Sequence, residues 1–189
     1  MDAAGDKKNF SLNEMVQRLI IYFTFYSVIG WCYEVFLEVV VYRWGFTNRG
    51  VLFGPYTPVY GFGALAFLIL VYPLIREKRG LKKLILMPVV FILCMAIATA
   101  IELGTSYILE YAIGSWPWQT YADYDINFQA RVALSPSIRF GLGGVLFLYV
   151  LQPIFEKITD KLGSKGVRIL SAVFIIMFAA DIIYTFIIK

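Results

Sequence analysis

The chain contains no histidine, and its 189 residues include only two cysteines. The absence of histidine removes the commonest general base and the commonest side-chain ligand of protein-bound metals. Cys32 and Cys94 both lie inside apolar runs, where two isolated thiols predict neither a structural disulfide nor a metal site. We therefore expect the protein to have no metal centre and no cofactor.

Charge is also scarce, because only 16% of the residues are charged while 60% are hydrophobic. Several apolar runs are long enough to cross a bilayer, which predicts an all-α, polytopic membrane helix bundle with about five transmembrane helices. We expect one integral membrane domain over residues 1–189. Its predicted spans are 19–42, 58–75, 84–111, 133–153 and 167–187.

Local signals mark some of the helix ends. Ser11 and Glu14 match a capping box, so a helix should begin at Ser11. Pro153 is expected to end the fourth span. Residues 154–162 should then form a short amphipathic helix that stops at Gly163.

The distribution of Lys and Arg predicts the orientation of the chain. Basic residues concentrate in cytoplasmic loops of membrane proteins. With the N-terminus inside, 12 of the 17 basic residues fall on the inner side. They are Lys7, Lys8, Arg18, Arg76, Lys78, Arg79, Lys82, Lys83, Lys157, Lys161, Lys165 and Arg168. The others are Arg43, Arg49, Arg131, Arg139 and Lys189. We therefore expect a multi-pass protein of the cytoplasmic membrane, with its N-terminus inside and its C-terminus outside. The basic residues in the inner loops account for the net charge of +4, so this charge does not indicate nucleic-acid binding.

Residues 48–63 differ from the apolar spans around them, because they combine four glycines with Pro55 and Pro58. The prolines prevent a continuous helix through this stretch. Irregular backbone at membrane depth survives only where protein buries it or where it lines a cavity. We therefore predict a re-entrant or half-helix element packed against the first and third spans, with Gly54 and Gly61 as tight positions. The alternative is an ordinary turn followed by the start of a helix.

Five charged residues fall inside predicted spans, namely Glu34, Glu38, Glu102, Arg139 and Asp181. Glu34, Glu102, Arg139 and Asp181 lie at similar depths of about 9–13 Å below the outer ends of their spans. Intramembrane charges are costly and commonly functional, so we predict an acidic, outward-facing pocket with Arg49 and Arg131 at its mouth. We expect Glu34, Glu102 and Asp181 to approach one another, and Arg49 to pair with Glu34 or Glu102. The alternative is a set of structural ion pairs such as Glu102–Arg139.

Several short motifs in the first three quarters of the chain form a recognisable set. They are Gly30-Trp31 with Glu34, Asn48-Arg49-Gly50, Gly54-Pro55, Pro58, Tyr60-Gly61-Phe62-Gly63, Glu102, Trp116, Trp118, Tyr121, Asn127, Arg131, Ser137 and Gly141. With these motifs, residues 20–155 resemble the ABC-transporter type IV (CmpB) family of small bacterial membrane proteins. The chain departs from the family pattern at Ala130, where glycine is expected, and at Arg139, where tryptophan is expected.

The resemblance implies a role in transport, yet the chain has no phosphate-binding Gly-x-x-x-x-Gly-Lys-Ser/Thr loop. If ATP drives the protein, the ATP must be bound by a separate cytoplasmic ATPase subunit. The basic loop 76–83 and the helix 154–162 are the predicted docking surfaces. The lipid bilayer is the other expected partner, and a homo-oligomer remains open.

The leading hypothesis is a transport component, either a permease or a substrate-capture subunit, that binds a small polar or cationic solute. The alternative is a membrane-embedded enzyme acting on a lipid or its headgroup, with Glu34 or Glu102 as acid/base and Arg49 as anion clamp. A channel and a scaffold are further alternatives. We favour a transport component over an enzyme. The predicted ligand-binding residues are Glu34, Glu38, Asn48, Arg49, Tyr60, Glu102, Asn127, Arg131, Arg139 and Asp181.

Overall fold

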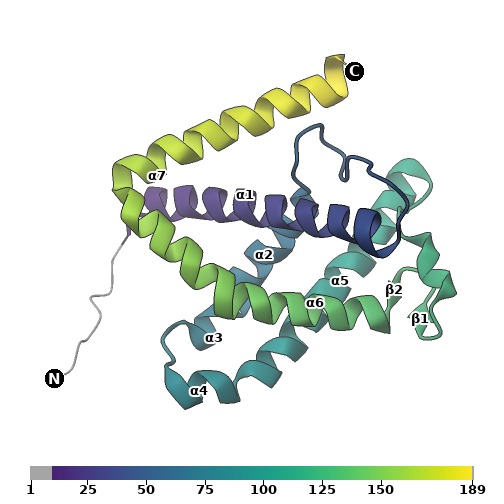
Figure 1. The fold of residues 1–189 in the computed structure, drawn as a ribbon, viewed down its shortest axis with the longest axis horizontal. Coiled ribbons are helices and arrows are strands. Elements are labelled where there is room, and N and C mark those ends of the chain that lie inside the picture. The colour runs from purple at the N-terminus through teal and green to yellow at the C-terminus, as the bar shows by residue number, and fades with distance from the viewer. Residues whose placement is uncertain (1–9, 189) are drawn as a thin grey trace. The chain divides into compact units, whose positions relative to one another are not determined.

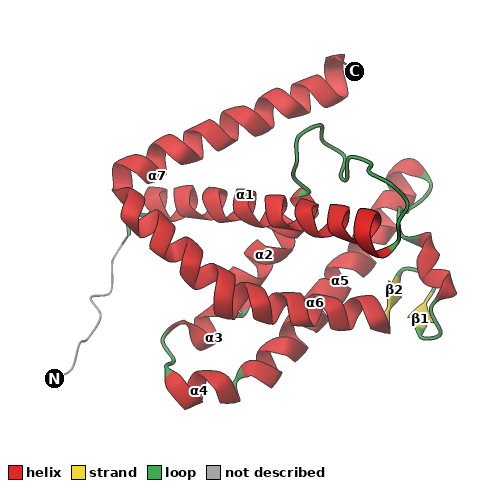
Figure 2. Ribbon diagram, viewed as in Figure 1, coloured by secondary structure: helices red, strands yellow, loops and turns green. Residues whose placement is uncertain are grey.

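The computed structural model describes residues 10–188 and is mostly helical (Figure 1). The α-helices are α1 (Leu12–Phe36), α2 (Pro58–Leu70), α3 (Tyr72–Arg76), α4 (Gly80–Ile85), α5 (Met87–Ile113), α6 (Leu134–Leu146) and α7 (Gln152–Ile183). Short π-helical or 3-10 turns are η1 (Leu37–Val41), η2 (Gln119–Asp123), η3 (Phe147–Leu151) and η4 (Tyr184–Ile188). A small antiparallel hairpin pairs β1 (Asn127–Phe128) with β2 (Val132–Ala133) (Figure 2).

Three helical segments are long and apolar enough to cross a membrane, namely Leu12–Val41, Gly80–Ala112 and Leu134–Ile188. Pro58–Leu70 is a shorter apolar helix. These segments confirm the predicted all-α membrane helix bundle. Lys7, Lys8 and Lys189, which entered the topology prediction, lie outside the described residues.

The described residues form two compact units. The first unit contains the residues up to Gly61 and those from Phe155 onward, and the second contains Phe62–Ile154. The boundaries therefore fall within α2 and within α7. The predicted single domain and its five spans stay predictions.

The first unit is built on α1 and on the two halves of α7. The helix α1 begins as predicted, because the Ser11 hydroxyl accepts a hydrogen bond of 3.2 Å from the Glu14 amide. Near its start the buried Arg18 side chain donates to Thr159 (2.9 Å) and Asp160 (2.8 Å) on α7. Further along, the Tyr26 and Phe155 rings lie 5.1 Å apart. Polar contacts near the helix start and aromatic packing beyond it join α1 to α7.

A sharp bend divides α7 at Gly163 (Figure 1). Gly163 has φ 63° and ψ 173°, a left-handed conformation that glycine adopts without a side-chain clash. The predicted helix stop at Gly163 is therefore confirmed.

The helix does not end at Pro153, where the sequence predicts the end of the fourth span. The helical backbone runs from α6 through η3 into α7, where Pro153 is the second residue. A proline ring clashes with the carbonyl four residues earlier and lacks an N–H group of its own. The π-helical turn η3 lies at that point, and its wider spacing accommodates the ring without ending the helix.

In the second unit α5 packs closely against α6. A side chain added at Gly141 would overlap the Phe91 ring, and one added at Gly144 would overlap Cys94. Small residues allow such close approach of helices, and a 2.7 Å hydrogen bond from Thr99 to Ser137 adds a polar link.

Candidate functional site

The chain between η1 and α2 is irregular and α2 begins at Pro58 (Figure 2), in keeping with the irregular backbone or half-helix predicted for residues 48–63. Asp181 of α7 holds this loop in place. The Asp181 carboxylate accepts hydrogen bonds from the amides of Phe53 (2.9 Å) and Gly54 (2.8 Å). It also accepts from the hydroxyls of Tyr56 and, at 2.9 Å, Thr185. One carboxylate therefore satisfies two backbone donors that have no helical partner.

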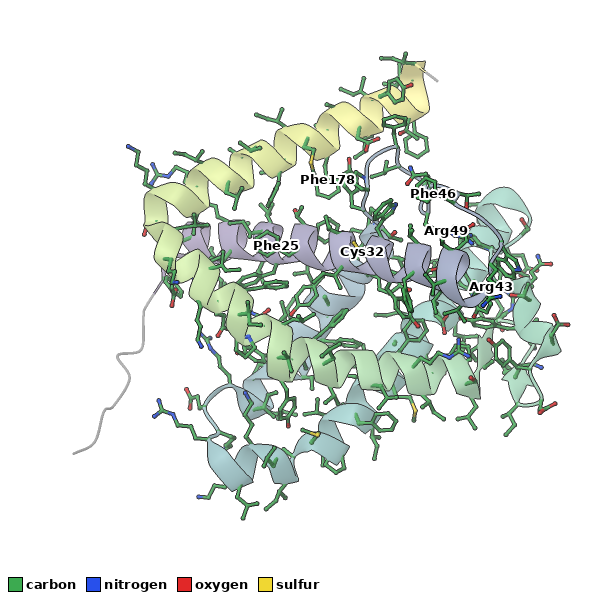
Figure 3. All side chains as sticks on the ribbon, in the orientation of Figure 1. Phe25, Cys32, Arg43, Phe46, Arg49 and Phe178 are labelled. Atoms are coloured by element: carbon green, nitrogen blue, oxygen red, sulfur yellow. The ribbon has the colours of Figure 1, made fainter. Side chains whose placement is uncertain are left out.

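Tyr56 is the most buried side chain of this loop, with 3% of its surface exposed. Its ring lies 4.6 Å from the ring of Phe178, which reaches from α7 toward the loop (Figure 3). Burial, followed by the hydrogen bond to Asp181, raises the pKa of Tyr56 above its ordinary value of 10.0. The hydroxyl therefore remains a donor at neutral pH.

Two contacts join the same loop to α1. The Asn48 side chain accepts from Trp31 Nε1 (2.8 Å) and donates to the Phe53 carbonyl (2.7 Å). The Thr57 amide donates to the Ser27 carbonyl at 2.9 Å. The predicted docking against the first span is thus confirmed, with Asn48 among the predicted partners, whereas packing against the third span stays a prediction. Sequence reasoning missed Asp181 as the main partner of the loop, although its place inside a span indicated a polar contact.

Gly54 and Gly61 are the tight positions that the sequence predicts. A side chain added at Gly54 would overlap the Tyr56 ring, and one at Gly61 would overlap Ser27 and Phe23. Tyr60 packs in the same way over Gly30 and donates its hydroxyl to Glu34. The start of α2 therefore lies directly on α1.

Arg49 pairs with Glu38, and the predicted pairing with Glu34 or Glu102 is wrong. Arg49 Nε and Nη2 each lie 2.9 Å from one oxygen of the Glu38 carboxylate, a bidentate contact. Thr47 also donates to this carboxylate, which is 4% exposed. Glu38 is the nearer partner because it lies one helical turn closer than Glu34 to the point where the loop leaves the helix.

In the second unit Arg131 is enclosed by aromatic rings. Its guanidinium carbon lies 4.0 Å from the centre of the Tyr107 ring and 4.1 Å from that of Trp116. It forms an ion pair with Glu110 and donates to Ser106 at 3.3 Å. Ser106 and Glu110 are one turn apart on α5, a spacing that could have identified them as a pair facing the same group.

The hairpin that carries Arg131 turns through Gln129 and Ala130, both at φ 55°. The Asn127 side chain accepts from the Ala130 amide (3.1 Å) and donates to the Tyr124 carbonyl (2.8 Å). Left-handed backbone favours glycine, which agrees with the glycine that the resemblance leads us to expect at the position of Ala130. Asn127 thus stabilises the turn.

Glu102 differs from the other acidic residues of the predicted pocket. Tyr121 donates to its Oε1 at 2.8 Å, while its Oε2 is buried and has no hydrogen-bond partner among residues 10–188. The ion pair with Arg139 that the sequence allowed does not form. Arg139 is exposed on α6 and donates to Ser135 at 3.2 Å.

The predicted meeting of three carboxylates stays a prediction, since Glu34 and Asp181 belong to the first unit and Glu102 to the second. Within residues 10–188, no group of three or more Cys, Asp and Glu side chains is placed to hold a metal ion.

Residues 21–186 match the family described as "Putative ABC-transporter type IV". No curated protein and no solved structure matches the chain. The family match covers most of the sequence, including the docked loop, the Arg131 hairpin and Glu102. The chain therefore belongs to this ABC-transporter-related family of membrane proteins.

Proposed function

We propose that the protein is the membrane component of an ABC-type transport system in the cytoplasmic membrane. In this proposal it binds a small polar or cationic solute from the outer side, and the Glu102 carboxylate is the principal contact. The family match and the membrane-spanning helices support the general role.

The unpartnered Oε2 atom of Glu102 is the observation that carries the solute-binding part of the proposal. Leaving a buried polar atom without a hydrogen bond costs about 1–3 kcal/mol, and more if the group is charged. A bound ammonium or hydroxyl group would offset that cost. A cationic solute would also neutralise the carboxylate.

The other predicted acidic residues already have partners. Glu38 is paired with Arg49, and Asp181 holds the loop. Glu34 accepts a hydrogen bond from Tyr60. These contacts support a structural role for the three residues, which narrows the proposed solute contact to Glu102.

We further propose that a separate ATP-hydrolysing subunit supplies the energy, because this chain has no phosphate-binding loop. The basic residues between α3 and α4 are its proposed docking surface. Arg76, Lys78, Arg79 and Lys82 are all exposed there. Electrostatic attraction would bring an acidic surface of the subunit to this loop.

The experiment measures thermal unfolding of the full-length protein in lipid nanodiscs, with a panel of small amines and uncharged polyols. At about 100 times its Kd, a bound solute stabilises the folded state by ~2.7 kcal/mol. We expect at least one amine to raise the Tm of the wild type but not that of Glu102→Gln. Glu77→Gln, in the exposed connection between α3 and α4, is the matched control and should respond like the wild type.

Two results would count against this proposal. One is an equal response of Glu102→Gln and the wild type, and the other is no response to any member of the panel. Release of a headgroup or fatty acid from nanodisc lipid by the wild type, lost in Glu102→Gln, would instead support the membrane-enzyme alternative.

A further inference from the structure

An apolar groove of about 340 Å³ lies in the first unit. Its volume falls within the range of about 300–1,000 Å³ typical of small-molecule sites. α1 contributes Phe25 and Val28 to the lining, and the two halves of α7 contribute Ile158 and Phe174. Both α1 and α7 belong to membrane-spanning segments, so hydrocarbon is the surrounding solvent.

The chemistry of the lining favours a hydrocarbon chain over a polar solute. Thr24 and Tyr56 are the polar side chains in the lining, and the hydroxyl of each already donates a hydrogen bond to another group of the protein. The Thr24 hydroxyl donates to the Ile20 carbonyl at 2.9 Å, and the Tyr56 hydroxyl donates to Asp181. The rest of the lining is aliphatic or aromatic, so it offers dispersion contacts and no further hydrogen bond.

The two ends of the groove differ. At one end Pro55 and Tyr56 belong to the loop that Asp181 holds in place. At the other end lies Ile158, next to Thr159, whose hydroxyl accepts from Arg18 near the start of α1. This second end leads toward the bend of α7 at Gly163. A ligand with one polar end would therefore place it at the bend.

The bend carries an excess of positive charge. Arg18 is paired with Glu14 and Asp160, so it is not available to a ligand. Four other cations around the bend are exposed and make no ion pair within residues 10–188. They are Lys157, Lys161, Lys165 and Arg168. Lys161 lies one helical turn beyond Ile158, and only Glu156 adds an acidic side chain besides Asp160 to this segment.

We propose that the groove binds one acyl chain of an anionic glycerophospholipid from the inner leaflet. The lipid phosphate would lie at the bend of α7, with Lys161 as the nearest cation. The sequence alone suggested that residues 154–162 dock an ATPase subunit, whereas the adjoining apolar groove favours a lipid. The site does not include Glu102. A failed test of the lipid site would therefore leave the proposed transport function unaffected, and the reverse is also true.

The test equilibrates full-length protein with vesicles of phosphatidylglycerol and phosphatidylcholine that carry the same oleoyl chains, and counts retained lipids by native mass spectrometry. We expect the wild type to retain phosphatidylglycerol preferentially. A basic residue close to the bound headgroup changes the affinity for an anionic lipid by about fivefold. Lys157→Glu/Lys161→Glu should therefore lower the preference at least about fivefold. Lys82→Glu/Lys83→Glu makes the same charge change in the other basic segment and should leave the preference unchanged.

A second variant tests the acyl-chain site without changing charge. Val28→Trp would fill the groove and should abolish tight retention of the lipid. Val40→Trp is the control, since Val40 is 55% exposed and does not line the groove. Equal retention of the two lipids by the wild type, or unchanged retention in Val28→Trp, would overturn the proposal. Loss of a dimer in Val28→Trp with lipid retention intact would show that a second copy of the chain occupies the groove.

Discussion

The buried charged side chains of Glu38 and Arg131 bind other parts of the same chain. Glu38 binds Arg49 through two contacts of 2.9 Å, and Arg131 lies between two aromatic rings beside Glu110. A buried charge that loses its partner is strongly destabilising, so such pairs fix the local structure even where their net contribution is small. Substituting one member of such a pair should therefore disturb the local structure first.

Replacing Arg49 with lysine tests whether the bidentate contact or only the charge matters. Lysine offers a point charge without the planar fork of arginine. We expect Arg49→Lys to increase proteolysis of residues 43–57 nearly as much as Arg49→Ala does. Wild-type resistance in the lysine variant would show that charge alone is sufficient. Arg43→Lys, outside this ion pair, is the matched control.

Replacing Ala130 with glycine should stabilise the hairpin. Left-handed backbone costs a non-glycine residue about 1–2 kcal/mol, and the greater chain entropy of glycine offsets about 0.5–1 kcal/mol of the gain. The expected net increase in unfolding free energy is about 0.5–1 kcal/mol, measured by thermal denaturation. Ala133→Gly, at an extended position with φ −142°, should lower stability instead. A decrease for Ala130→Gly would contradict the left-handed turn.

At the scale of elements, the loop of residues 43–57 and the start of α2 act together as one element docked on α1 and α7. Its polar anchors are Asp181 on α7 and the Ser27 carbonyl on α1. Its close contacts are the glycines that lie against Tyr56, Ser27 and Phe23. Either kind of contact can be removed separately.

Two glycines of α2 provide a matched pair for testing this docking. An added side chain at Gly61 would overlap α1, whereas one at Gly63 would meet nothing within 4 Å. Gly61→Val should lower the unfolding free energy by about 1–3 kcal/mol through overpacking. Gly63→Val should stay within about 0.5 kcal/mol of the wild type. Similar thermal denaturation of the two variants would contradict the close packing.

Hydrogen exchange tests the anchor at Asp181. Asp181→Asn replaces one acceptor oxygen with an amide NH2 group, which donates and cannot accept from a backbone amide. Since a hydrogen bond to a charged group contributes ~1.5–3 kcal/mol, at least one of the Phe53 and Gly54 amides, which bind different oxygens, should exchange at least about tenfold faster. Thr185→Val removes a neighbouring contact to Asp181 and should change these two rates much less. Unchanged rates in Asp181→Asn would mean that other contacts hold the loop.

At the scale of the whole molecule, the positive-inside pattern predicts how the chain crosses the membrane. In a background with Cys32→Ser and Cys94→Ala, single cysteines at Lys82 and Tyr124 mark opposite sides. An impermeant maleimide should label Tyr124→Cys in intact cells, but Lys82→Cys only after permeabilisation. The reverse result would invert the predicted orientation.

The sequence alone determined the class of the protein and several local features. Apolar runs predicted the membrane helices, because a helix that crosses lipid must be apolar over its length. Ser11 predicted a helix start, and Gly163 a helix stop. Pro55 and Pro58 predicted irregular backbone before α2. Each of these features depends on the backbone properties or the composition of a short segment, which one sequence displays directly.

The tertiary structure decided which charged groups meet. Spacing along the chain could not show that Arg49 pairs with Glu38, that Asp181 binds the loop or that Arg131 pairs with Glu110. These choices depend on the path of a loop and on the rotation of each helix, which packing fixes. For the same reason, matched depth grouped four intramembrane charges but could not show that Glu102 keeps an unpartnered oxygen.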